Sequence, residues 1–147
     1  MSYLLDDTDY CEQHDIRFVN REYLRAFYMI SKESPIDTID RWAGLIVEIE
    51  KGYNWEPLEL DSHLNIARME VDDLLQHPQL EHFNEHAIFQ NTVNELDECF
   101  KTLTFEHEQE GQQEVKWYNK RILKKAGPEY YSFFDENLRK SIQLLNV

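Results

Sequence analysis

The sequence has few of the residues that mark specialised scaffolds and binding loops. Its 147 residues include two cysteines, Cys11 and Cys99, and four glycines. Two cysteines so far apart do not make a disulfide framework, so we expect both to be reduced thiols. With so few glycines there is no glycine-rich cradle for phosphate, and no nucleotide-binding motif is found. The composition therefore argues against a disulfide scaffold and against a nucleotide-binding fold.

Long apolar runs and a basic leader are also missing. The longest apolar run is short, as at residues 44–47, and the first residues read Met-Ser-Tyr-Leu-Leu-Asp-Asp. Neither a membrane span nor a signal peptide is predicted from these patterns, and we expect a cytoplasmic location. A chain of 147 residues with 41% hydrophobic content can build one core. We therefore expect a single domain over residues 1–147, with an acidic N-terminal arm at 1–15.

What the chain has in excess is negative charge, with a formal net charge of -14. Residues 1–115 hold 26 acids against 8 lysines and arginines, whereas residues 116–147 hold 3 acids against 7. A surface of this kind repels nucleic acid and anionic lipid and attracts cationic partners. We expect the basic C-terminal part to dock against the acidic helices, where it helps to balance their charge.

Apolar residues recur at helical spacing along almost the whole chain. Asn20 is expected to cap the first helix and Asp37 the second, and Asp61 or Ser62 to open the third. The expected helices span residues 20–33, 37–52, 61–76, 79–108, 112–126 and 128–145. No segment shows the alternation of a strand. The sequence therefore predicts an all-α, single-domain bundle of about five to seven helices.

The longest expected helix, at 79–108, changes its apolar face along its length. Phe89 and Leu96 belong to one narrow seam, whereas Leu80 falls on nearly the opposite side when each residue advances by about 100°. We therefore expect that the helix either breaks near residues 84–88 or packs on two sides.

The stretch HFNEH, at residues 82–86, matches the pattern H-x-x-E-H of the inverted zinc peptidases. On a helix, His82 and His86 project from the same side and can reach one zinc ion, with Glu85 as the general base. The resemblance covers five residues, and neither the sheet nor the distant glutamate ligand of that family is predicted here. In a chain with 6 histidines and 29 acids, such a short match arises by chance. We therefore expect no enzyme and no cofactor, and keep a zinc hydrolase as the third alternative.

Carboxylates beside aromatic side chains form the candidate site. Aromatic anchors supply buried contact energy in protein interfaces, and surrounding charges steer the encounter with a basic partner. The expected partner-binding residues are Tyr53, Trp55, Glu56, Glu59, Asp61, Asp72, Asp73, Asn91, Glu95 and Glu98.

In size, acidity and helical content, the chain resembles the small acidic immunity proteins of bacterial toxin systems, of the colicin and contact-dependent inhibition types. This class-level resemblance rests on no motif, so no residue of that class can be placed on this sequence. It implies a cytoplasmic bacterial inhibitor that binds the basic cleft of a nuclease toxin domain. No direct contact with nucleic acid, membrane or small molecules is expected.

Two other classes of protein fit the same composition. A structural or adaptor helical domain would carry its acids for solubility and use its seam as a contact between copies. A nucleic-acid mimic would display carboxylates at phosphate-like spacing to a DNA-binding protein.

Overall fold

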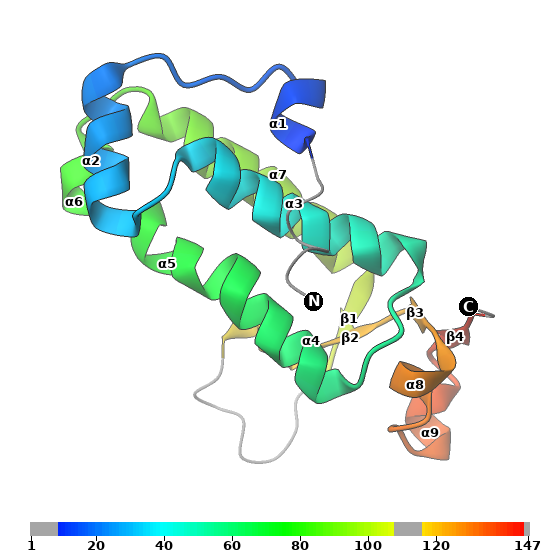
Figure 1. The fold of residues 1–147 in the computed structure, drawn as a ribbon. Helices are drawn as coiled ribbons and strands as arrows, with labels where there is room; N and C mark the ends of the chain where they lie inside the picture. The colour runs from blue at the N-terminus through cyan, green and yellow to red at the C-terminus, as the bar shows by residue number, and fades with distance from the viewer. Residues whose placement is uncertain (1–8, 108–115, 146–147) are drawn as a thin grey trace.

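Three long helical stretches form the body of the molecule. The structure is a computed structural model and describes residues 9–107 and 116–145. The long stretches are α3 (Pro35–Gly52), α7 (His86–Thr102) and the continuous run of α4 (Pro57–Leu64), the π-helical turn η2 (Asn65–Met69) and α5 (Glu70–Leu75). Figure 1 shows α3 lying along α7, with the run from α4 to α5 beneath them.

Shorter elements cover the ends of this three-helix body. α1 (Tyr10–Gln13) packs on α3, and α2 (Arg21–Ser31) packs on α6 (Pro78–Glu81). α1 lies within the expected N-terminal arm, whose residues 1–8 are outside the described part of the chain. After α7 come β1 (Thr104–Glu106), the short 3-10 helix η3 (Trp117–Lys120), β2 (Arg121–Leu123), β3 (Lys125–Ala126), α8 (Pro128–Tyr131), α9 (Glu136–Arg139) and β4 (Gln143–Leu144).

Capping residues explain where the first long helices begin and end. The Asn20 side chain accepts hydrogen bonds from the first-turn amides of α2, as predicted. The cap of α3 lies three residues earlier than expected, at Ser34 instead of Asp37, and Pro35 takes the first helical position. Gly52 ends α3 with a φ of 117°, a conformation that favours glycine. Pro35 therefore starts α3.

Proline also moves the start of the third helical stretch. Pro57 occupies the first turn of α4, so the helix begins before Asp61 and Ser62, where it was expected. The stretch closes before His77, as predicted. The carboxylates from Glu59 onwards therefore lie on a helix rather than in the loop that precedes it.

The expected helix at 79–108 is broken, as its change of apolar face indicated. α6 ends at Glu81, the chain turns at residues 82–85, and α7 starts at His86. Its C-terminal end also differs, because Thr104–Glu106 leave the helix and form strand β1. Gly111, expected to end this helix, lies outside the described residues.

The expected helix at 112–126 is wrong over the part that the structure describes. Residues 121–123 form β2, which pairs antiparallel with β1 so that Phe105 faces Ile122. β3 pairs in parallel with β4, and the final helix at 128–145 is reduced to α8 and α9. Over residues 9–107 and 116–145 the fold is therefore mostly helical with two small two-stranded sheets, which corrects the purely α-helical expectation.

Aromatic side chains dominate the core. The largest fully buried side chains are Trp42, Tyr23, Tyr53, Tyr118, Tyr130, Phe27, Phe89 and Phe100. Because a buried tyrosine hydroxyl or indole N–H needs a hydrogen-bond partner, this core also draws polar groups inward. Those polar groups decide which candidate residues remain free for a partner.

Candidate partner-binding surface

His86 of the HFNEH stretch is a core residue. It is buried, its Nδ1 lies 2.8 Å from the Tyr23 hydroxyl, and its Nε2 lies 3.1 Å from the carbonyl oxygen of Leu75. A carbonyl only accepts, so Nε2–H donates to Leu75 and Nδ1 accepts from Tyr23. Burial lowers the pKa of His86. Both ring nitrogens therefore have protein partners and neither points to solvent.

The other members of the stretch have different surroundings. The Glu85 carboxylate accepts hydrogen bonds from the backbone amides of Val19 and Asn20, at 2.5 and 3.0 Å, and so ties the start of α2 to the turn before α7. His82 is exposed and lies against the Phe83 ring. Over residues 9–107 and 116–145, no three His, Cys, Asp or Glu side chains group as metal ligands. HFNEH therefore spans a structural turn that joins α6 to α7.

The predicted aromatic anchors lie inside the molecule or at its edge. Tyr53 is fully buried, and its hydroxyl lies 2.6 Å from Nδ1 of His63. Trp55 is half-buried, with its ring edge-on to His63, and Glu56 beside it is exposed. Tyr53 therefore does not fit the predicted role of an anchor for a partner, because the core already encloses it.

Two of the predicted carboxylates bind the C-terminal segment of the same chain. The Asp61 carboxylate accepts a hydrogen bond from the Asn119 side chain at 3.2 Å, and its half-burial raises the pKa of the group. The Asp72 carboxylate accepts a hydrogen bond from the Tyr118 hydroxyl at 2.9 Å and lies 3.5 Å from Nζ of Lys116. Asp61 and Asp72 thus hold the segment after residue 115 against the helices and do not fit a partner-facing role.

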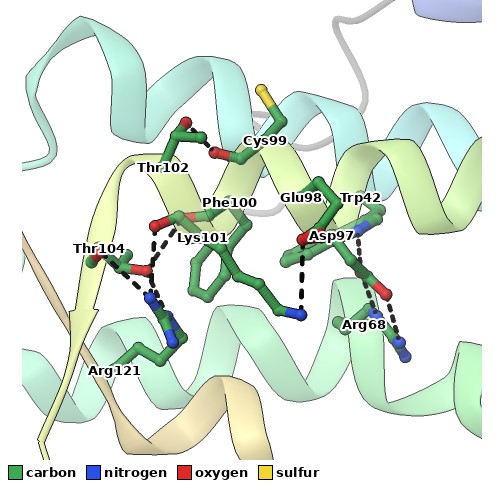
Figure 2. A network of polar contacts seen from close by, with 10 residues as sticks. All are labelled: Trp42, Arg68, Asp97, Glu98, Cys99, Phe100, Lys101, Thr102, Thr104 and Arg121. Carbon is green, nitrogen blue, oxygen red and sulfur yellow. Dashed lines mark hydrogen bonds and ion pairs between the residues drawn. The ribbon is translucent and has the colours of Figure 1, made fainter.

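A buried ionic cluster joins the three long helical stretches, and of its charged members only Asp72 belongs to the predicted site. Arg68 on η2 donates to both carboxylate oxygens of Asp97 on α7 at 2.9 Å, and to Asp72 at 2.5 Å. The indole N–H of Trp42 on α3 donates to Asp97 at 3.0 Å. Figure 2 shows Asp97 between Trp42 and Arg68. The guanidinium also lies over the Trp117 ring, so this cation is enclosed on several sides.

Apart from Glu56, the remaining predicted polar residues, which are four carboxylates and Asn91, are exposed on two separate helical stretches. Glu59 and Asp73 lie on the run from α4 to α5. Asn91, Glu95 and Glu98 lie on the outer side of α7, which we call the α7 face. Because the two stretches meet through Arg68 and Asp97 on their inner sides, the exposed acids form two faces rather than the one predicted patch.

The run from α4 to α5 also exposes apolar side chains that sequence reasoning did not select. Leu58 is 75% exposed, Ile66 45% and Met69 42%. We use the name α4–α5 face for the exposed residues Leu58, Glu59, Ile66, Met69, Glu70 and Asp73. Ile66, Met69 and Asp73 recur at spacings of three and four residues, which place them on one side of a helix, and this spacing is the signal that could have found them.

This face has no exposed cation of its own. The only lysine or arginine in residues 57–76 is Arg68, which is 3% exposed and paired with Asp97 and Asp72. The outward side of the run is therefore acidic and apolar, and its one positive charge is turned inward.

Comparison with protein-family models, curated proteins and solved structures found no match to this chain. Within the described residues, no helix combines the length and the apolar character that crossing a membrane requires. The function is therefore inferred from the chain's own surfaces.

Proposed function

We propose that this chain is an acidic protein-binding inhibitor, an immunity protein that covers the basic active-site cleft of a nuclease toxin in the bacterial cytoplasm. The observation that carries the proposal is the α4–α5 face, where apolar and acidic side chains are exposed together while Arg68 is withdrawn into the core. Apolar contacts and complementary charge are the two components of a tight protein interface.

The proposed inhibition follows from the chemistry of nucleases. A cleft that binds the phosphates of RNA or DNA is lined with lysine and arginine, and exposed carboxylates compete for the same cations. The net charge of -14 accelerates the encounter at low ionic strength, and apolar contacts slow the dissociation. The inhibitor then blocks substrate by occupying the cleft, with no chemistry of its own.

The enzymatic alternative has no comparable support, because both ring nitrogens of His86 are engaged inside the core. The adaptor and nucleic-acid-mimic alternatives share the acidic surface but differ in partner, which is another copy of the chain or a DNA-binding protein. The identity of the bound protein therefore separates them.

The test is a pull-down of the tagged full chain from lysate of its own host, washed at low and at high salt. We expect one basic protein with nuclease activity, retained at low salt and weakened at high salt. The purified partner should lose its nuclease activity at a 1:1 ratio, with an association rate that falls as ionic strength rises. A retained protein that keeps full nuclease activity in the complex would contradict the proposal, as would retention of the chain itself and nothing else.

A further inference from the structure

A groove lies between the C-terminal end of α2 and α5, at one end of the α4–α5 face. Its volume is about 290 Å³, and we call it the α5 groove. It is lined by Ile30, Ser31, Glu33, Glu70, Asp73 and Leu74. Glu70 and Asp73 belong both to the groove and to the face, so the two features are continuous.

The carboxylates around the groove differ in their partners. Glu33 is engaged within the protein, because it pairs with Arg41 and accepts a hydrogen bond from the Thr38 hydroxyl at 2.9 Å. The side chains of Glu70 and Asp73 make no hydrogen bond or ion pair with any residue in the described part of the chain. Two exposed carboxylates therefore line the groove and can accept hydrogen bonds from a ligand.

The lining also offers apolar surface beneath those carboxylates. Leu74 is buried, and Ile30 is half-buried. A lysine or arginine side chain has the matching pattern, since its aliphatic stem favours apolar surface and its cationic head favours carboxylates. The carboxylates would repel a small anion, and a wholly apolar group would leave them without a cation.

Apolar residues continue from the groove along the α4–α5 face. Met69 precedes Asp73 by one turn, and Ile66 and Leu58 extend the line toward the start of α4. From Leu58 to Asp73 the line is about 22 Å long at about 1.5 Å per residue. Ridges of this spacing pack into the grooves of another helix.

We propose that the α5 groove binds a lysine or arginine side chain, and that Leu58, Ile66 and Met69 bind the apolar side of the same element, a cationic amphipathic helix on the partner. This inference rests on the proposed function and deepens it, because it names which face meets the basic protein. Charge complementarity selects the occupant: the face presents carboxylates and apolar side chains, and its single cation, Arg68, is buried.

The α7 face matches such a helix less well. Glu98 lies 3.5 Å from Nζ of Lys101, so part of its charge is balanced within the protein. Ile88 is the one large apolar side chain on α7 that is substantially exposed, at 39%. Glu95 and Glu98 therefore provide a matched control of equal charge on a different helix.

The experiment uses a synthetic helical peptide of leucine and lysine, about as long as the line from Leu58 to Asp73, and the full-length protein. Its binding is measured by fluorescence anisotropy and located by amide chemical-shift changes in NMR spectra. A second peptide, with the same lysines but alanine in place of leucine, tests the apolar contribution. The two protein variants are Glu70→Lys with Asp73→Lys, and Glu95→Lys with Glu98→Lys, which change the net charge equally.

We expect shift changes centred on residues 58–74, and a loss of affinity of about tenfold or more in the Glu70→Lys, Asp73→Lys variant. The Glu95→Lys, Glu98→Lys variant should lose much less, and the alanine peptide should bind more weakly than the leucine peptide. Equal losses in the two variants would overturn the inference, because they would show attraction to net charge alone. Shift changes centred on α7 would overturn it as well.

The same variants keep this inference separate from the proposed function. If a nuclease is retained and inhibited equally well by the Glu70→Lys, Asp73→Lys variant, the docking face is wrong although the inhibitor proposal stands. If the peptide binds at the α5 groove as expected while no basic protein is retained from lysate, the docking face stands and the proposed function fails.

Discussion

The carboxylate of Asp97 connects donors from two other helical stretches, the Trp42 indole and the Arg68 guanidinium. Replacing Asp97 with alanine would leave a buried arginine with only the half-buried Asp72 as its counter-charge. Removing one partner of a buried ion pair typically costs about 3 to 5 kcal/mol. We expect Asp97→Ala to lower the free energy of unfolding by that amount in urea titrations followed by circular dichroism.

A paired substitution is the control for this prediction. Arg68→Met combined with Asp97→Leu removes both charges and fills the space with apolar atoms, so the loss should be smaller than for Asp97→Ala alone. If the double variant is less stable than Asp97→Ala, the ion pair stabilises the fold by more than the desolvation of its two charges costs.

Residue types alone did not single out Asp97 or Arg68. Asp97 is one of 29 acids, and it lies between Leu96 and Glu98, so it sits at the border of the apolar seam. A charged residue at such a border position faces solvent or core depending on its partner. Its partner Arg68 lies 29 positions away in the sequence, and only the packing of α7 against η2 brings the two together.

At the scale of elements, Gly127 marks the place where the C-terminal segment meets the loop between α3 and α4. The Gly127 amide donates to the Tyr53 carbonyl at 2.8 Å, and the Asn54 side chain accepts from the Glu129 amide at 2.8 Å. A methyl group added at Gly127 would lie 2.3 Å from Cγ and Oδ1 of Asn54. We expect Gly127→Ala to lower the free energy of unfolding by about 1 to 3 kcal/mol in the same titrations.

Asn54→Ala tests whether that steric conflict is the cause. The double variant Asn54→Ala, Gly127→Ala removes the side chain that the new methyl group would meet. Its loss of stability should be less than the sum of the two single losses. Strict additivity would show that Gly127 matters for another reason.

Elements with strong local signals were predictable, and those that depend on distant pairing were not. Asn20 caps its helix through amides two and three residues ahead, so the sequence nearby contains all the required information. β2 has three residues, and they pair with residues of β1 that lie 15 to 19 positions earlier, in the register Thr104–Leu123, Phe105–Ile122 and Glu106–Arg121. A strand this short has no alternation to detect, and its basic, aromatic neighbours gave an apparent helical pattern.

At the scale of the whole molecule, two buried tyrosine–histidine pairs make stability depend on pH. The Tyr53 hydroxyl is hydrogen-bonded to His63, and the Tyr23 hydroxyl to His86. Burial lowers the pKa of both histidines below the ordinary value of about 6.5. Between the folded and unfolded pKa values the unfolded chain binds more protons, so the free energy of unfolding falls as pH falls below about 6.5. Each histidine contributes at most about 1.4 kcal/mol per pH unit.

The measurement is the free energy of unfolding from pH 7.5 to 5 for the wild type and for His63→Asn and His86→Asn. Each variant places an amide where Nδ1 was and cannot take up the proton, so its pH dependence should be flatter than that of the wild type. His82→Asn is the control, because an exposed side chain is hydrated both before and after unfolding. An unchanged slope in His63→Asn and His86→Asn would rule out these histidines as the source.

The exposure of the candidate residues was predictable for some of them and not for others. Glu59, Asp73, Glu95 and Glu98 are exposed as a carboxylate surface requires. Tyr53, Asp61 and Asp72 were also selected, but they are held by partners at distances of 10 to 58 residues in the sequence. An aromatic or acidic residue looks the same in a sequence whether its partner is inside the chain or on another protein.

Because Arg68 points inward, the inner side of the run from α4 to α5 makes the ionic contacts that hold the run in place. The outer side of the run forms the surface exposed to solvent. Arg68 pairs with Asp97 and Asp72, whereas the side chains of Glu70 and Asp73 form no hydrogen bond or ion pair across residues 9–107 and 116–145. We therefore expect substitutions at the outer positions Glu70 and Asp73 to cost little stability, whereas replacing only one of Arg68 and Asp97 should destabilise the fold. Under the proposed function, related chains would keep the buried charges of Arg68 and Asp97 while their outer faces differ from one bound protein to another.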